Sequence, residues 1–120
     1  MLRSSTLLLV TIAALAFAAA AGATAGPVGP LPPGPVTTIS TIGSSFVSVV
    51  LPKAAQGRVW RQARQYNGNV LRQVSEANVG ANVVIVFQAV GHGSTKVVYG
   101  LTRGETPKAY ASATFKITVR

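Results

Sequence analysis

Histidine, cysteine and acidic side chains, which most often serve as general acids, general bases or metal ligands, are few in this sequence. There is one histidine, His92, there are two glutamates, Glu76 and Glu105, and there is neither cysteine nor aspartate. General acid–base catalysis needs such a group held against a substrate, but glycines flank His92 on both sides, which predicts an exposed turn. A zinc site needs three or four ligands and would use every such side chain. We therefore expect no enzyme, no metal and no cofactor.

Basic side chains dominate the electrostatics of the chain. Eleven Lys and Arg residues against two acids give a formal net charge of +9 at pH 7, which draws a protein toward acidic partners without identifying them. The period of two in a strand puts Arg58 and Arg64 on the side of Trp60. Arg61 then lies on the opposite face, and Arg72 belongs to the next strand. Because this cluster is split and Trp60 is expected in the core rather than exposed for base stacking, we do not expect a nucleic-acid partner.

The N-terminus has the three-part order of a secretory signal peptide. A basic start at residues 1–3 precedes an almost wholly apolar run at residues 7–21, and Ala23-Thr24-Ala25 provides an A-x-A cleavage site. A transmembrane helix would need about 20 apolar residues with anchoring flanks, and a stretch rich in proline and glycine ends this run early. We expect residues 1–25 to be removed on export, leaving a protein secreted or kept in the cell envelope. An uncleaved membrane anchor is the alternative.

A short linker and one small domain follow the leader. Residues 26–35 read GPVGPLPPGP, and this proline and glycine content predicts an extended, uncollapsed linker. Residues 36–120 are enough for one small domain and not two. Since the chain has no cysteine, packing and strand pairing must hold that domain without disulfides.

The domain alternates apolar and polar residues, with turn residues about every 8–12 positions, as expected of a β-sandwich. Phe115, Ile117 and Val119 share one face, for example, and Asn67-Gly68 is a tight-turn signal because both residues tolerate positive φ. β-branched residues are frequent and disfavour helix. The pattern predicts an all-β fold, a single immunoglobulin-like sandwich of about seven strands. The expected strands are residues 36–42, 46–51, 58–66, 70–74, 83–89, 95–101 and 110–119.

The order of the framework residues carries a family resemblance. A strand ends in Leu51-Pro52, a loop ends in Gly57, and Trp60 follows in the next strand. This order is similar to the opening of the chagasin-type inhibitors of papain-like cysteine proteases. The stretches FQAVG at residues 87–91 and VVY at 97–99, and the ending at 115–119, resemble later parts of the same family.

The resemblance implies an immunoglobulin-like, non-catalytic domain that needs no cofactor. In the family, three loops at one end of the sandwich form a wedge that enters the protease cleft and blocks the catalytic cysteine without being cut. Carried onto this sequence, the wedge consists of residues 53–57, 76–82 and 101–108. The residues expected to contact the protease are Lys53, Ala54, Ala55, Gln56, Gly57, Gly80, Ala81, Leu101, Thr102 and Arg103.

The contact motifs themselves depart from the family pattern. The family's first loop reads Asn-Pro-Thr-Thr-Gly, and its threonine pair falls on Ala55 and Gln56 here. The glycine-rich second loop keeps Gly80 alone. In the third, Leu101, Thr102 and Arg103 take the places of Arg-Pro and an aromatic residue. A second function therefore stays open, namely a non-inhibitory basic module that binds an acidic glycan, polymer or protein.

Overall fold

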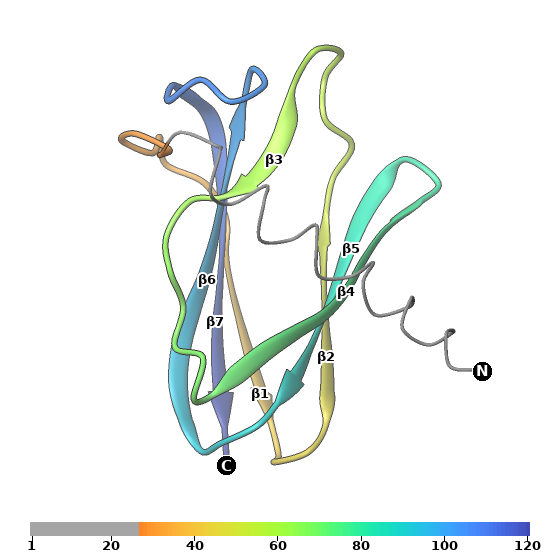
Figure 1. The fold of residues 1–120 in the computed structure, drawn as a ribbon, viewed down its shortest axis with the longest axis vertical. Helices are drawn as coiled ribbons and strands as arrows, with labels where there is room; N and C mark the ends of the chain where they lie inside the picture. The colour runs from red at the N-terminus through yellow and green to blue at the C-terminus, as the bar shows by residue number, and fades with distance from the viewer. Residues whose placement is uncertain (1–26) are drawn as a thin grey trace, which may run out of the picture.

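Seven β-strands in two layers make up the described part of the protein, residues 27–120 of a computed structural model (Figure 1). The expected all-β, immunoglobulin-like sandwich is confirmed. No helix within residues 27–120 is long and apolar enough to cross a membrane. The expected signal peptide, 1–25, lies outside the described residues. The strands are β1 (Val36–Thr41), β2 (Phe46–Leu51), β3 (Val59–Gln62), β4 (Leu71–Val79), β5 (Asn82–Ala89), β6 (Gly93–Thr102) and β7 (Ala109–Val119).

The two sheets differ in size and in strand direction. The larger sheet has the order β1-β7-β6-β3, and the smaller has the order β2-β5-β4. All pairs are antiparallel except β1 with β7, which run parallel. Consecutive strands therefore often lie in different sheets, and the loops that cross between sheets gather at the two ends of the sandwich (Figure 1).

The core lies between the sheets because alternate residues of each strand point inward. Val49 and Leu51 of β2 and Phe87 of β5 contribute from the smaller sheet, and Val97 of β6 and Ile117 of β7 from the larger one, all almost fully buried. Two edge-to-face aromatic pairs, Tyr66–Phe87 and Tyr99–Phe115, join this cluster. The alternation seen in the sequence is thus the alternation that the core uses.

Strand β4 is longer than the sequence predicts. The expected strand ends at Val74, and the region 76–82 was expected to be a loop. In the structure a β-bulge lies between Gln73 and Ser75, and β4 continues beyond it to Val79. The loop prediction is wrong because side chains beyond the bulge are exposed on both faces, so this half of the strand carries no apolar alternation.

The segment 27–35 was expected to be an uncollapsed linker, but here it packs on the outer face of the larger sheet. Val28 is buried, and its side chain lies against Gly100 of β6. Ser112 Oγ donates a 2.7 Å hydrogen bond to the Pro32 carbonyl, and the Thr114 amide donates one of 3.0 Å to Pro35. The missing proline amides leave the segment without strand pairing of its own, yet its carbonyls accept hydrogen bonds from β7 and its apolar side chains Val28 and Leu31 lie against Gly100 of β6.

Two turns that the sequence predicts are present, and one of them is built differently from its sequence signal. Asn67 and Gly68 do start a turn, but neither has a positive φ. Instead the Asn67 side chain accepts a 2.8 Å hydrogen bond from the Asn69 amide, an Asx turn that Asn forms readily. His92 is exposed in the bend before β6, which confirms the expected turn.

Candidate functional site

Three loops lie at the same end of the sandwich, the end opposite the C-terminus (Figure 1). They are the first loop, residues 52–58 between β2 and β3, the second loop, residues 80–81 between β4 and β5, and the third loop, residues 103–108 between β6 and β7. We call this region the loop end. The fold therefore brings together the three segments in which the sequence placed the contact residues.

The first loop is closed by its own hydrogen bonds. The Arg58 amide donates to the Ala55 carbonyl at 3.0 Å, and Gly57 has φ +80°, the left-handed conformation that a type II turn requires at this position. Trp60 Nε1 donates a 2.8 Å hydrogen bond to the Pro52 carbonyl. Trp60 is partly buried and packs against the core, so it anchors the base of the loop while serving the expected core role.

The second loop is much shorter than predicted. Val79 pairs with Asn82, which leaves Gly80 and Ala81 alone as a two-residue hairpin turn. Gly80 has φ +63°, and a glycine in the first central position is the signature of a type II′ turn. Its tip is exposed, as is the adjacent Val79, whose exposed fraction is 58%.

The third loop is supported by a hydrogen-bonded chain that starts at Arg61. Arg61 Nε donates to Thr102 Oγ1 at 3.0 Å, and Thr102 Oγ1 donates to the Gly104 carbonyl at 2.7 Å. Arg61 Nη2 also donates to the Thr106 carbonyl at 2.8 Å. Thr106 in turn donates from its amide and its hydroxyl to the Arg103 carbonyl. The loop is therefore fixed at several points along its length.

The N-terminal segment supports the same loop from outside. The Gly29 amide donates a 2.8 Å hydrogen bond to the Pro107 carbonyl. Arg64 donates through Nη1 to the Val28 carbonyl and through Nη2 to the Gly29 carbonyl, each at 3.2 Å. The sequence placed Arg64 on the side of Trp60, which is wrong because β3 ends at Gln62 and the chain turns before Arg64. Arg61 does lie on the face opposite Trp60, as predicted.

The predicted contact residues do not all reach the surface. Lys53, Ala55, Gln56 and Gly57 are exposed in the first loop, Gly80 and Ala81 at the second, and Arg103 in the third. Ala54 is half-buried. Leu101 and Thr102 belong to β6 and have exposed fractions of 8% and 0%, so their side chains serve the fold and the support of the third loop. The exposed part of the third loop is residues 103–108.

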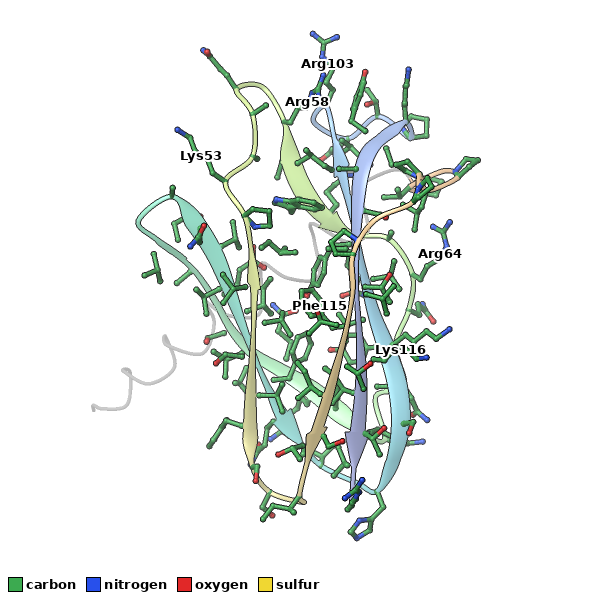
Figure 2. The ribbon with its side chains drawn as sticks, turned by 180° about the vertical axis from the view of Figure 1, so that it is seen from behind. Lys53, Arg58, Arg64, Arg103, Phe115 and Lys116 are labelled. Atoms are coloured by element: carbon green, nitrogen blue, oxygen red, sulfur yellow. The ribbon has the colours of Figure 1, made fainter. Side chains whose placement is uncertain are left out.

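The loop end carries most of its charge as cations. Lys53 and Arg58 come from the first loop and Arg103 and Lys108 from the third, against Glu105 as the acid. Figure 2 shows Lys53, Arg58 and Arg103 at this end, with Lys53 and Arg103 directed outward. The centroid of the Tyr110 ring lies 3.9 Å from Arg58 Cζ and 5.1 Å from Lys108 Nζ, so one aromatic ring links the first loop to the third by cation–π contacts.

The residues with catalytic potential are not brought together. His92 lies in the β5–β6 turn, at the end of the sandwich opposite the third loop that carries Glu105 (Figure 1). Glu76 lies within β4. Within residues 27–120, no group of three or more histidine, cysteine or acidic side chains could hold a metal ion.

Sequence reasoning missed the residues that hold the third loop. Arg61 was treated as part of a basic cluster, and Thr106 and Gly29 were not singled out. Nothing in the local pattern signals a bond between Arg61 and Thr106, which are 45 residues apart in the chain. The available hint was that Arg61 lies on the outer face of its strand, where an arginine can lie over a neighbouring strand and reach a loop carbonyl.

Comparisons with known proteins agree with this architecture at the level of the fold. No protein-family model matches the chain, and no curated protein sequence matches it. Among solved structures, the chain is similar to the cysteine protease inhibitor EhICP2 from Entamoeba histolytica, with a TM-score of 0.55 and 13% identity over 74% of this chain and 99% of that one. It is also similar to PbICP-C, solved in complex with falcipain-2, with a TM-score of 0.56 and 13% identity over 79% and 95%.

These neighbours define the class of scaffold. The chain has the immunoglobulin-like sandwich of these inhibitor structures over nearly their whole length. The resemblance that the framework residues indicated is thus confirmed for the fold. Fold similarity at this identity does not carry the function with it, so the function has to be argued from the loop end.

Proposed function

We propose that this protein is an exported, non-catalytic inhibitor that blocks the active-site cleft of a papain-like cysteine protease reversibly with its loop end. The signal-peptide pattern of residues 1–25 supports export to a secreted or cell-envelope location. The similar structures EhICP2, a cysteine protease inhibitor, and PbICP-C, in complex with falcipain-2, support the class of partner.

The observation that carries the proposal is the construction of the loop end. Each of the three loops is held by its own contacts: the turn at Gly57, the two-residue hairpin at Gly80, and the Arg61–Thr102–Gly104 chain. Ordering flexible segments on binding costs free energy, so loops that are already fixed lose less affinity to that cost. A surface that is to fill a cleft without being cut needs this rigidity.

The composition of the exposed surface fits a contact region. Small side chains at Ala55 and Ala81 allow close approach, and the valines beside the loops, Val59 and Val79, are 43% and 58% exposed. Loss of the family's contact motifs leaves the scaffold and the placement of the loops intact. We therefore propose a wedge with its own contact residues, chosen from the first loop, Gly80, Ala81 and residues 103–108.

The experiment is inhibition of papain and falcipain-2 by the purified chain, with a fluorogenic substrate at several concentrations. We expect saturable inhibition that is competitive with substrate. The variant Ala81→Trp adds bulk at the second loop, and the matched variant His92→Trp adds the same side chain in the turn at the opposite end. Since added bulk at a close-fitting surface forces rearrangement, Ala81→Trp should raise the inhibition constant about tenfold or more, while His92→Trp should leave it unchanged.

Two results would contradict the proposal. Full protease activity in the presence of micromolar, demonstrably folded chain would exclude inhibition of these enzymes. Equal effects of the two tryptophan variants would show that the loop end is not the contact surface.

A further inference from the structure

The charge of the loop end and its placement specify the chemistry of the partner. Four basic side chains, Lys53, Arg58, Arg103 and Lys108, come from two loops that a single ring, Tyr110, holds together. The chain has two acidic side chains for eleven basic ones, so most of this charge is not neutralised within the molecule. Two of the four cations, Lys53 and Arg103, are directed outward at the rim (Figure 2).

Small uncharged residues lie beside these cations on the same loops. They are the exposed residues Ala55, Gln56 and Gly57 of the first loop and the hairpin turn Gly80-Ala81. Protein interfaces usually combine an uncharged centre with a polar rim, and the loop end offers both kinds of surface. The uncharged residues are thus available to enter a cleft and the cations to meet the surface around it.

We propose that the loop end is built for a protease whose active-site cleft has an acidic rim, with Lys53 and Arg103 facing rim carboxylates. This inference rests on the proposed function and adds the charge of the partner to it. Complementary charge at a rim mainly speeds association and rejects partners with the wrong charge. Cations at this rim would thus select among papain-like proteases by the acidity of the surface around their clefts.

Net charge alone would not produce this selectivity, and the chain provides a control for it. Lys96 and Lys116 face each other across β6 and β7 and are exposed on the strands, and Figure 2 places Lys116 well away from the loop end. The double variant Lys53→Glu/Arg103→Glu changes the net charge as much as Lys96→Glu/Lys116→Glu does. The two differ only in where the charge changes.

The test measures association rates by inhibition progress curves. The targets are papain-like proteases chosen for different net charge within about 10 Å of the cleft, the Debye length at 0.1 M salt. For acidic-rim proteases we expect Lys53→Glu/Arg103→Glu to slow association at least tenfold, with the loss shrinking as salt rises. The control variant should stay within about twofold of the unsubstituted chain. For basic-rim proteases the loop-end variant should associate faster than the unsubstituted chain.

Each other outcome counts against the inference in a distinguishable way. Inhibition that is independent of rim charge, or equal slowing by both double variants, would overturn it while leaving the proposed function intact. Inhibition of no protease by the unsubstituted, folded chain would overturn both. Salt-sensitive retention of that non-inhibiting chain on a sulfated polysaccharide, lost in Lys53→Glu/Arg103→Glu, would assign the same cations to an acidic polymer instead.

Discussion

Tyr99 illustrates how a single buried polar atom shapes the pH response of this domain. Within residues 27–120, its hydroxyl is a buried side-chain oxygen with no hydrogen-bond partner. Burial raises the pKa of the Tyr99 phenol well above its ordinary value, and the charges of Glu76 and Tyr66 raise that pKa further. The ring still contributes to the core through its edge-to-face contact with Phe115. The hydroxyl therefore lowers the stability of the folded state, while the ring of the same side chain raises it.

Replacing this hydroxyl should stabilise the fold and reduce the loss of stability at high pH. A folded-state pKa above the unfolded value means that the folded protein holds the proton more tightly, so the free energy of unfolding falls as pH rises above about 10. We expect Tyr99→Phe to reduce that fall and, at pH 7, to leave the free energy of unfolding unchanged or raise it by about 1 kcal/mol. Urea unfolding between pH 7 and 11 measures both effects. A Tyr99→Phe variant with the same alkaline fall and lower stability would show that the hydroxyl has a partner.

Thr102 tests the support of the third loop. Its buried hydroxyl accepts from Arg61 and donates to Gly104, so Thr102→Val keeps the shape of the side chain and leaves the Gly104 carbonyl without this donor. We expect a loss of about 1–3 kcal/mol in the free energy of unfolding. Thr118, whose hydroxyl bonds to Ser94 on the exposed surface, provides the control, since Thr118→Val should stay within about 0.5 kcal/mol. Equal urea midpoints for the two variants would contradict the role assigned to Thr102.

At the element scale, β2 and β5 are predicted well because each of them buries one face. β2 and β5 were expected at residues 46–51 and 83–89, and the structure has them at Phe46–Leu51 and Asn82–Ala89. The second half of β4 was not predicted because both of its faces are exposed beyond the bulge at Gln73/Ser75. Alternation of apolar and polar residues indicates a strand with one buried face, so it cannot indicate the part of a strand that buries neither face. For the same reason the sequence did not predict that the second loop is a turn of only two residues.

The packing of the segment 27–35 on the larger sheet was not predicted for a different reason. Proline-rich composition predicts that a segment lacks strand pairing but does not indicate whether it docks elsewhere. Here docking depends on the match between its carbonyls and distant donors such as Arg64 and Ser112. A pairing of this kind is set by the tertiary fold, so no local pattern could have predicted it.

Gly34 tests whether this docking stabilises the domain. A Cβ at this position would meet the backbone oxygen of Ser112 in β7. Because backbone cannot move aside as a flexible side chain can, Gly34→Ala should lower the free energy of unfolding by about 1–3 kcal/mol. Gly68 is the matched control, since a Cβ there would meet no atom within 4 Å and its φ is not positive. Gly68→Ala should leave stability unchanged or raise it by about 0.4–1 kcal/mol.

Amide hydrogen exchange separates the two explanations for a Gly34→Ala effect. Loss of protection confined to residues 27–35 and the third loop would indicate that the segment detaches and releases the loop it supports. Protection lost evenly across the sandwich would indicate global destabilisation. Equal stability of Gly34→Ala and Gly68→Ala would show that the segment contributes nothing to the fold.

At the scale of the whole molecule, the scaffold could be predicted from the sequence to a greater extent than the site. The sandwich could be predicted because core positions such as Phe87 and Ile117 keep a strict alternation. The placement of the candidate site at one end followed from the family resemblance, and the structure locates the three loops there. The residues that make the loops rigid, Arg61 above all, could not be predicted, because their partners are set by strand order and not by local sequence.

The net charge of +9 acts on the whole molecule and gives folding and binding opposite responses to salt. Like charges repel within the compact state and lower its stability, and Lys96 directly faces Lys116 in the larger sheet, a destabilising pair.

Between about 10 mM and 100 mM salt the Debye length falls from about 30 to about 10 Å, so thermal denaturation should show Tm rising with sodium chloride. In Lys96→Glu, which turns the facing pair into an attractive one, the starting Tm should be higher and its rise with salt smaller. If folding instead depended on ion pairs, Tm would fall with salt. If Tm rises while association with a protease slows over the same range, the excess cations cost stability and speed binding, which is the pattern expected when charge is retained for a partner.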